Sequence, residues 1–266
     1  MQGGFVKDFL RELFILIGKR PSLRNTLLER INSLNSQDII ATNTSTDYPN
    51  LYTIASGLFS GVTYVRSNLW SNDHETALKI MGCYEYQILK EIEKYSIENF
   101  ISIGAADGYY AIGLLKTKCK KAFLIESDKR NYPLIYENAK LNNVEADVRI
   151  VDDIHIIFTE LTQTLSKRSI NLLICDIEGD EYSLFDDNAL ISSLYSHNFK
   201  LILELHDRNS HLRDSLKEKL KSHYKVRTLP STIRDVSNKN VIPNIFESAM
   251  FVAEKRGNNY EFIICD

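Results

Sequence analysis

The sequence predicts an α/β fold with a mostly parallel sheet that helices cover on both faces. From Asn99 onward, short apolar runs typical of strands alternate with segments of helical periodicity. Strands are expected at 99–104, 121–126, 146–151, 171–176, 199–205, 223–229 and 247–254, and helices at 108–118, 129–142, 156–167, 181–195 and 209–222. Such alternation is typical of parallel strands joined by crossover helices. Only a loop separates the last two strands, which are therefore expected to form an antiparallel hairpin.

The first 72 residues are expected to form a helical extension and lid, and residues 73–266 the main domain. Phe5, Phe9, Leu13 and Ile17 recur at helical spacing. A second helix is expected from Ser22 to about residue 35. The first helix is apolar over a wide arc and carries little net charge, which favours packing or homodimerisation over a membrane contact.

Residues 51–70 mix aromatic and β-branched residues with two glycines, which predicts a short hairpin or an ordered lid. Four aromatic residues of this stretch either stack on a substrate ring or pack the lid: Tyr52, Phe59, Tyr64 and Trp70. A helix is then expected from Asp73 to Tyr95, capped by Asn72 or Asp73 and weakened at Gly82.

Composition and charge exclude several classes of protein. The 266 residues are 44% hydrophobic and 25% charged, as is usual for a globular protein. The formal net charge of −3 gives no electrostatic case for binding nucleic acid. No apolar run of 18 residues occurs, and charged residues interrupt the N-terminal apolar segment, so neither a membrane span nor a signal peptide is expected.

The four cysteines are far apart in the sequence, and none lies in a CxxC pair: Cys83, Cys119, Cys175 and Cys265. This usage is typical of a reducing compartment rather than of a disulfide framework or a zinc site. The sequence therefore predicts a cytoplasmic location.

An acidic turn begins at the last residue of the buried strand 171–176. It contains four carboxylates in a short segment, namely Asp176, Glu178, Asp180 and Glu181. Acids at the end of an apolar strand are costly without cationic partners, hydrogen-bond donors or a metal. In open α/β sheets, ligands bind outside the carboxyl ends of the strands. We therefore expect Asp176 and Glu178 to face a ligand, whereas Asp180 and Glu181 are better explained as the start of the next helix.

A turn of small residues follows the strand 99–104. Gly104 permits a sharp turn, and Ala105 and Gly108 permit close approach of a ligand to the main chain. The glycine spacing departs from GxGxxG, and Asp107 would repel a phosphate. A ligand with a positive amino or sulfonium group is therefore favoured over a dinucleotide, although an ordinary strand–helix turn with Asp107 as a helix cap also explains the pattern.

Acids follow the next two strands as well. Glu126 lies about 20 residues beyond Gly104, where a ribose-binding carboxylate is expected in a Rossmann-like unit. Asp128 is better explained as a helix cap. After the third strand, Asp152 or Asp153 accepts a hydrogen bond from an adenine amino group or caps a helix.

Together these motifs resemble the class I S-adenosylmethionine-dependent methyltransferases, whose seven-stranded Rossmann-like sheet has an antiparallel last strand. More narrowly, the chain resembles the FkbM-like family. The resemblance extends over roughly residues 80–255. The segments that carry it are Gly82-Cys-Tyr-Glu85, Ile103-Gly-Ala-Ala-Asp-Gly-Tyr-Tyr-Ala111, Glu126, Asp176-Ile-Glu-Gly-Asp-Glu181 and Leu203-Glu-Leu-His206. Ser102 departs from the pattern, because an acid often stands there.

The resemblance implies an O-methyltransferase acting on a sugar, a polysaccharide or a glycosylated metabolite. The residues that it and the motifs assign to S-adenosylmethionine are Glu85, Gly104, Ala105, Asp107, Gly108, Glu126, Asp152 and Asp176. Methyltransferases that act on the amino groups of bases carry an Asn/Asp-Pro-Pro-aromatic signature after the fourth strand. Here Asp176-Ile-Glu-Gly179 stands in that place, which supports an oxygen acceptor.

A hydroxyl acceptor requires a base, and His206 is the candidate because imidazole titrates near neutral pH. Asp176 and Glu178 complete the expected catalytic set. Asp176, Glu204 and Asp207 are candidate ligands for Mg²⁺, which prefers oxygen. A structural histidine at 206 is the alternative. Two other classes remain, a nicotinamide-dependent oxidoreductase and a non-catalytic nucleotide-binding module.

Overall fold

The computed structural model describes residues 36–37, 39–41, 44, 48, 50–67, 69, 71–151, 154, 169–206, 210–229 and 260–266. The helices expected before residue 36 and at 156–167, and the strand expected at 247–254, lie outside this part of the chain. No helix in the described part combines the length and the apolar character that a membrane span requires.

The main sheet has seven strands in the order β5-β4-β3-β6-β7-β9-β8. The strands are β3 (Ile97–Ile103), β4 (Lys121–Ile125), β5 (Val148–Val151), β6 (Ile170–Cys175), β7 (Phe199–His206), β8 (Val226–Leu229) and β9 (Tyr260–Cys265). Strands β5, β4, β3, β6 and β7 pair in parallel, and β9 pairs antiparallel with both β7 and β8. This confirms the predicted fold class.

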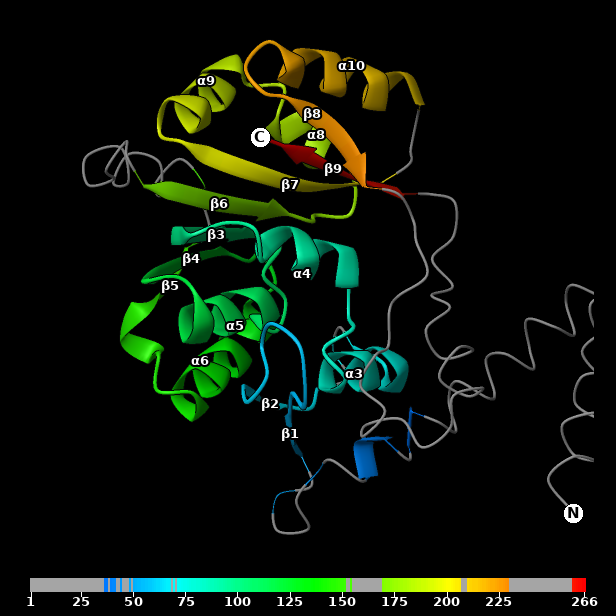
Figure 1. Cartoon of the computed structure of the whole chain (residues 1–266), viewed down its shortest axis with the longest axis vertical. Helices are drawn as coiled ribbons and strands as arrows, with labels where there is room; N and C mark the ends of the chain where they lie inside the picture. Colours follow the sequence, from blue (N-terminus) through cyan, green and yellow to red (C-terminus); the bar gives the residue numbers. More distant parts are fainter. Residues whose placement is uncertain are drawn as a thin grey trace, which may run out of the picture.

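The position of the last strand differs from the prediction. The strand that pairs with β7 and β8 is Tyr260–Cys265 rather than residues 247–254. Strand β9 lies between β7 and β8, so the terminal strands do form an antiparallel pair, with β8 at the edge of the sheet (Figure 1).

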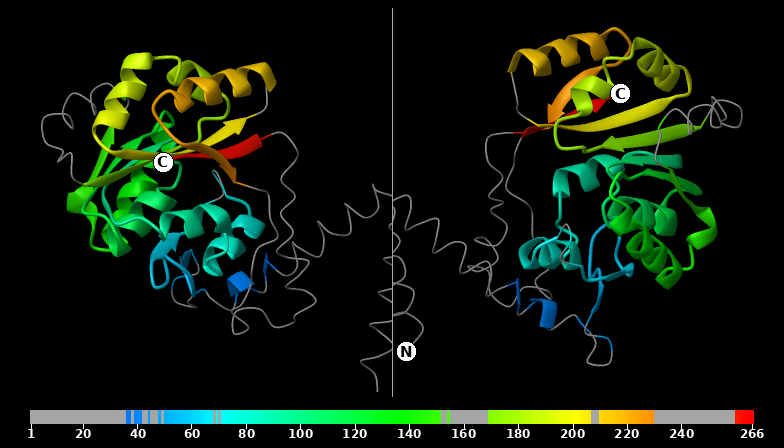
Figure 2. Two further views of the ribbon diagram at one scale, coloured as in Figure 1. Left: turned by 45° about the horizontal axis from the view of Figure 1, so that its top comes forward. Right: turned by 180° about the vertical axis from the view of Figure 1, so that it is seen from behind.

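Helices cover both faces of the sheet, as the alternation predicted (Figures 1 and 2). On one face lie α4 (Tyr86–Ile92), α5 (Tyr109–Thr117) and α6 (Tyr132–Leu141), and on the other α8 (Glu181–Leu184), α9 (Asn188–Ser196) and α10 (Ser210–Lys221). The two cores draw on alternate residues of the strands: Phe100 belongs to the first and Ile101 to the second. A buried strand with both faces covered explains the continuous apolar runs in the sequence.

Two of the expected helices are interrupted. The helix expected from Asp73 to Tyr95 divides into α3 (Asp73–Ile80) and α4, with the break at Gly82. Gly82 has a φ of +68°, and a Cβ there would lie 2.0 Å from the backbone oxygen of Ser56. The helix expected at 181–195 divides into α8 and α9, because the side chain of Asp187 caps a new helix start.

The expected hairpin is present as β1 (Leu51–Thr53) and β2 (Thr63–Val65). Side-chain amides of α6 and of its C-cap residue hold the hairpin backbone: Val65 N donates to Asn138 Oδ1 at 2.8 Å, and Thr63 N donates to Asn142 Oδ1 at 3.0 Å. Tyr52, Phe59 and Tyr64 are fully buried in the first core, so these rings pack against the protein rather than face a substrate. Trp70 lies outside the described residues.

Candidate functional site

The predicted site residues meet where neighbouring strands end. Strand β6 lies between β3 and β7, with Cys175 paired to both Ile103 and Leu203. Gly104 follows β3 and Asp176 follows β6. Glu204 and His206 are among the last three residues of β7. Parallel strands therefore deliver the glycine turn, the acidic turn and the histidine to one edge of the sheet.

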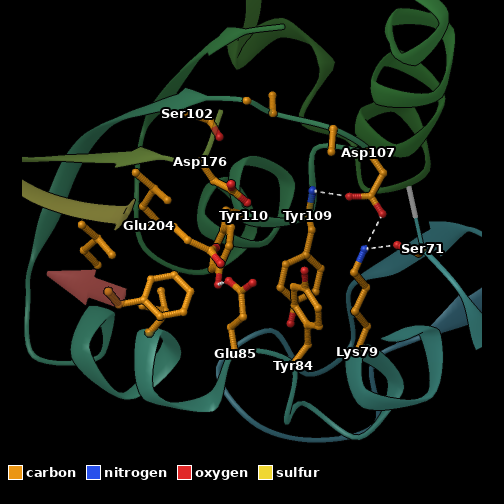
Figure 3. Close-up of a pocket in the computed structure, with 17 residues that line it drawn as sticks. Ser71, Lys79, Tyr84, Glu85, Ser102, Asp107, Tyr109, Tyr110, Asp176 and Glu204 are labelled. Atoms are coloured by element: carbon orange, nitrogen blue, oxygen red, sulfur yellow. Dashed lines mark hydrogen bonds and ion pairs between the residues drawn. The ribbon is translucent and has the colours of Figure 1, made fainter. Parts of the chain in front are cut away.

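A pocket opens at this edge (Figure 3). Its empty volume is about 630 Å³, part of it open solvent, which lies within the range of ligand sites. Six predicted site residues line it, namely Glu85, Gly104, Ala105, Asp107, Asp176 and Glu204, together with Ser102. The structure thus brings together residues that are more than 100 positions apart in the sequence.

The glycine turn is held against the acidic turn by backbone contact. Gly104 has a φ of +80°, and a Cβ at this position would lie 1.8 Å from the backbone oxygen of Asp176. Asp176 N donates to the Ile103 oxygen at 2.9 Å. Only glycine allows both the left-handed conformation and this approach. The two turns therefore form one unit.

Glu126 supports the same turn from β4. Its Oε2 accepts from Ala106 N and its Oε1 from Asp128 N, each at 2.7 Å. Ala106 has a positive φ of 47°, a conformation that costs energy for a residue with a side chain. Neither Glu126 nor Gly108, the N-cap residue of α5, lines the pocket described above.

Asp107 forms a buried ion pair with Lys79 of α3. Its Oδ2 lies 2.6 Å from Lys79 Nζ, and the two side chains are only 9% and 4% exposed. Its Oδ1 accepts from the backbone N of Tyr109, the first residue of α5, although the N-cap residue of this helix is Gly108 rather than Asp107. Lys79 also donates to Ser71 Oγ at 2.8 Å. The positive partner of Asp107 in the structure is thus a lysine.

Glu85 enters the pocket from the opposite side, at the start of α4. It is buried, and it has a left-handed φ of 47°. Tyr110 donates a short hydrogen bond to its carboxylate, and burial together with Glu85 raises the pKa of Tyr110. Figure 3 shows Glu85, Asp176 and Glu204 grouped together, with Asp107 and Lys79 beyond the tyrosine rings. The acids therefore concentrate at one end of the pocket.

His206 lies among four carboxylates. Its Nε2 is 3.3 Å from Glu178 Oε2, 3.7 Å from Asp176 Oδ1 and 4.0 Å from Glu204 Oε1. Its Nδ1 is 3.1 Å from Glu181 Oε1. The hydrogen bond with Glu181, followed by the charges of the other acids, raises the pKa of His206, although burial acts in the opposite direction.

Asp176 has an unusual carboxyl group. Burial first and the nearby charge of Glu85 second raise its pKa to about 7, while His206 acts in the opposite direction. The side chain as a whole is 41% exposed, yet its Oδ1 is shielded from solvent and has no hydrogen-bond partner in the described part of the chain. A perturbed, unsatisfied carboxyl at a strand end is a candidate ligand-binding group.

A divalent cation at this edge would find a mixed set of ligands. Asp176, Glu178 and His206 each offer one atom, and these atoms lie within 4.8 Å of one another. Mg²⁺ prefers oxygen, whereas an imidazole ligand suits transition metals. The predicted oxygen set is represented by Asp176 and Glu204, and its third member, Asp207, lies outside the described residues, as does Asp152.

Sequence reasoning missed two charged residues of the site. Glu181, expected only to start a helix, is fully buried and contacts His206. Lys79 is buried against Asp107. Neither has a distinctive sequence signal, because an acid in the first turn and a lysine in the last turn are ordinary features of helices. Only the three-dimensional arrangement identifies them.

The comparisons with known proteins concern the fold. Neither a protein-family model nor a curated protein matches the chain. Among similar solved structures is precorrin-6y C5,15-methyltransferase from Geobacter metallireducens, with 13% identity over 70% of this chain and 88% of that one, at a TM-score of 0.43. Ribosomal protein L11 methylase from Lactobacillus delbrueckii subsp. bulgaricus has 14% identity over 74% and 80%, also at 0.43. A methyltransferase from Pyrococcus furiosus has 14% identity over 68% and 82%, at 0.39.

With TM-scores below 0.5, these similarities carry no argument about what the chain does. The strand order and the antiparallel β9 define its class directly, as a seven-stranded Rossmann-like fold of the kind that the sequence resemblance implied.

Proposed function

We propose that the chain is an S-adenosylmethionine-dependent O-methyltransferase of the FkbM-like kind, acting on a hydroxyl group of a sugar, a polysaccharide or a glycosylated metabolite. One observation carries the proposal. The pocket outside the carboxyl ends of β3, β6 and β7 joins the glycine turn at Gly104 with Asp176, directly beside His206. Ligands of open α/β sheets bind in this crevice.

The charges of the pocket suit the proposed cofactor. Glu85, Asp176 and Glu204 present carboxylates to a space that an ammonium or sulfonium group would occupy favourably. Gly104 and Ala105 leave the backbone open beside it. Glu126 is proposed to meet the ribose; each of its oxygens accepts one backbone hydrogen bond and has a second lone pair for a ribose hydroxyl. Gly108, Asp107 and Asp152 complete the proposed cofactor set.

The proposed chemistry assigns the proton to His206. When bound, S-adenosylmethionine supplies a methyl group to the acceptor. His206 Nε2 takes the proton from the acceptor hydroxyl, and the resulting imidazolium lies within 3.7 Å of both Asp176 and Glu178, which stabilise its charge. A base positioned in this way typically contributes a factor of about 10²–10⁴ in rate.

Mg²⁺ bound by Asp176, Glu204 and Asp207 is a separate part of the proposal. His206 cannot serve as the base through Nε2 and as a metal ligand through the same atom, so the proposal assigns it to the proton. Turnover that survives a chelator and is unaffected by added Mg²⁺ would remove the metal from the mechanism. Restoration of chelated enzyme by Mg²⁺ would support it.

Calorimetry tests the cofactor. We expect S-adenosylmethionine to bind with a Kd well below about 1 mM, and Glu85→Gln to weaken that binding. Absence of binding at about 1 mM would refute the methyltransferase, and binding of NADH instead would indicate an oxidoreductase.

A second experiment tests the acceptor: labelled methyl should be transferred to hydroxyl-bearing glycans but not to amine-bearing analogues. Binding without transfer to any acceptor would indicate a non-catalytic module.

Location and assembly complete the proposal. All four cysteines are free and buried, which fits the reducing, cytoplasmic compartment that we propose. A homodimer through the N-terminal helices remains a proposal, because those helices lie outside the described residues.

A further inference from the structure

Glu181, the last carboxylate of the acidic turn, is buried in the protein. It is the first residue of α8, and its exposure is 0%. A buried charge is tolerated only with hydrogen-bonding partners. Two are present: Ile177 N donates to its Oε1 at 2.9 Å, and His206 Nδ1 lies 3.1 Å from the same oxygen. Although burial alone would raise the pKa of Glu181, these bonds lower it, so the group is an ionised acceptor.

Helix α8 holds His206 at two points. Glu181 contacts the ring, and the hydroxyl of the next residue, Tyr182, donates to the backbone oxygen of His206 at 2.8 Å. Both ends of the histidine are therefore set by adjacent residues of one short helix. Such double anchoring fixes the direction in which the ring points.

The contact with Glu181 also determines the tautomer of the ring. An ionised carboxylate only accepts hydrogen bonds, so Nδ1 must carry the proton. In the neutral ring, Nε2 then has the lone pair, and Nε2 is the atom that lies 3.3 Å from Glu178 and 3.7 Å from Asp176. The ring thus presents its acceptor nitrogen to the strand ends where Asp176 lines the pocket.

We propose that Glu181 is the positioning residue of the site: it accepts the Nδ1 proton of His206 and thereby aims the Nε2 lone pair at the acceptor hydroxyl. The inference rests on the proposed function for its effect on turnover, but its effect on the ring stands apart from turnover. A carboxylate that orients a histidine base in this way is worth up to about 10⁴ in kcat in serine proteases.

The decisive variant is Glu181→Gln, which preserves shape and removes the charge. Nitrogen NMR of ¹⁵N-histidine-labelled protein, at a pH where the ring is neutral, reads the tautomer of His206, which is assigned by comparison with His206→Asn. We expect the wild type to carry the proton on Nδ1 and the variant to gain the Nε2-protonated form. We also expect kcat to fall by about 10²–10⁴ with the Kd for S-adenosylmethionine within about twofold of wild type, a split that a purely structural lesion would not produce.

Asp180→Asn is the matched control, because it removes the same charge one position earlier from a side chain that makes no capping hydrogen bond. It should leave the tautomer and kcat unchanged. An unchanged tautomer in Glu181→Gln, or a kcat within twofold of wild type, would overturn the positioning role. If the wild type failed to bind S-adenosylmethionine, the proposed function would fail while the NMR result still decided the role of Glu181.

Discussion

Four carboxylates surround the imidazole of His206, and their charges determine when the ring can accept a proton. Glu181 bonds to Nδ1, while Asp176, Glu178 and Glu204 lie within 4.0 Å of Nε2. The raised pKa makes the neutral ring a stronger base and moves its formation to higher pH. The same acids that strengthen the base thus reduce its population at any given pH.

We expect activity to increase with pH beyond the ordinary titration range of histidine. A raised pKa delays loss of the proton, so the base form appears only as pH rises through that higher value. Measurement of kcat/KM from about pH 6 to about pH 10 checks this. Glu178→Gln removes a negative charge next to Nε2, so it should lower the pKa of His206 and move the rising limb toward acid. An alkaline displacement in this variant would contradict the assignment.

Gly104→Ala tests whether the glycine turn and the acidic turn form one unit. Gly61 is the matched control, since its φ of +86° is also left-handed but a Cβ there would have no neighbour within 4 Å. Gly61→Ala should cost about 1–2 kcal/mol of folding free energy through backbone strain alone. Gly104→Ala should cost at least about 2 kcal/mol more, because the Asp176 backbone must move. Equal losses in urea unfolding would show that the contact is unimportant.

At the scale of elements, the β1–β2 hairpin is held against α6 and its C-cap by side-chain amides. Asn138 of α6 is fully buried. Its Oδ1 accepts from Val65 N, and its Nδ2 donates to the backbone oxygen of Asp107 at 2.9 Å. One amide thus connects the hairpin with the glycine turn. The hairpin alternative expected for residues 51–70 is therefore present as an ordered element, and a role of this stretch as a substrate lid stays a prediction.

Replacement of Asn138 by alanine should destabilise the protein by about 2–4 kcal/mol, because one buried and one partly buried backbone group lose their partners. It should also weaken binding of S-adenosylmethionine, since the Asp107 turn loses a support. Glu137→Ala is the control: it is the preceding, exposed residue of the same helix, and its replacement should change stability by less than about 0.5 kcal/mol. Urea unfolding and calorimetry measure both effects, and similar losses in the two variants would refute the coupling.

The elements could be predicted from sequence where the pattern is local. Buried parallel strands appear in the sequence as apolar runs. Gly104, Asp176 and His206 could be predicted as site residues because they lie at the ends of such runs. The last strand could not be placed, because 247–254 and 260–265 are both apolar and the choice depends on register with β7. The role of Glu181 depends on the fold of the 176–181 turn, and that of Lys79 on the packing of α3 against the glycine turn.

At the scale of the whole molecule, a polar network joins α4 to the two terminal strands. Arg227 of β8 bonds to Glu91 of α4 and to Asp266 at 3.0 Å, and Tyr95 donates to Asp266 at 2.6 Å. Although burial alone would raise the pKa of Glu91, its hydrogen bonds from Arg227, Lys94 and Tyr95 lower it below 4.5. The network therefore stabilises the fold only while these acids are ionised.

Stability should consequently fall as pH drops below about 4.5, because a lowered pKa contributes stability above the unfolded-state value and loses it as pH falls through the folded-state value. Arg227→Met should cost about 1–3 kcal/mol near neutral pH and reduce that acid-induced loss, since the pKa of Glu91 rises. Lys120→Met breaks an exposed pair with Glu98 and should change stability by less than about 1 kcal/mol. Urea unfolding at several pH values checks both; an unaltered pH dependence in Arg227→Met would contradict the network.

The insertion of β9 between β7 and β8 constrains the order in which the strands can join the sheet during synthesis. A ribosome releases β3 to β8 before residues 260–265 emerge, yet in the native register β8 reaches the sheet only through β9. The parallel core from β5 to β7 can therefore assemble during translation, with the outer edge of β7 unpaired until synthesis reaches β9. An exposed edge of this kind is an aggregation hazard for a nascent chain, so slow translation of the segment between β8 and β9 should increase the demand for chaperones.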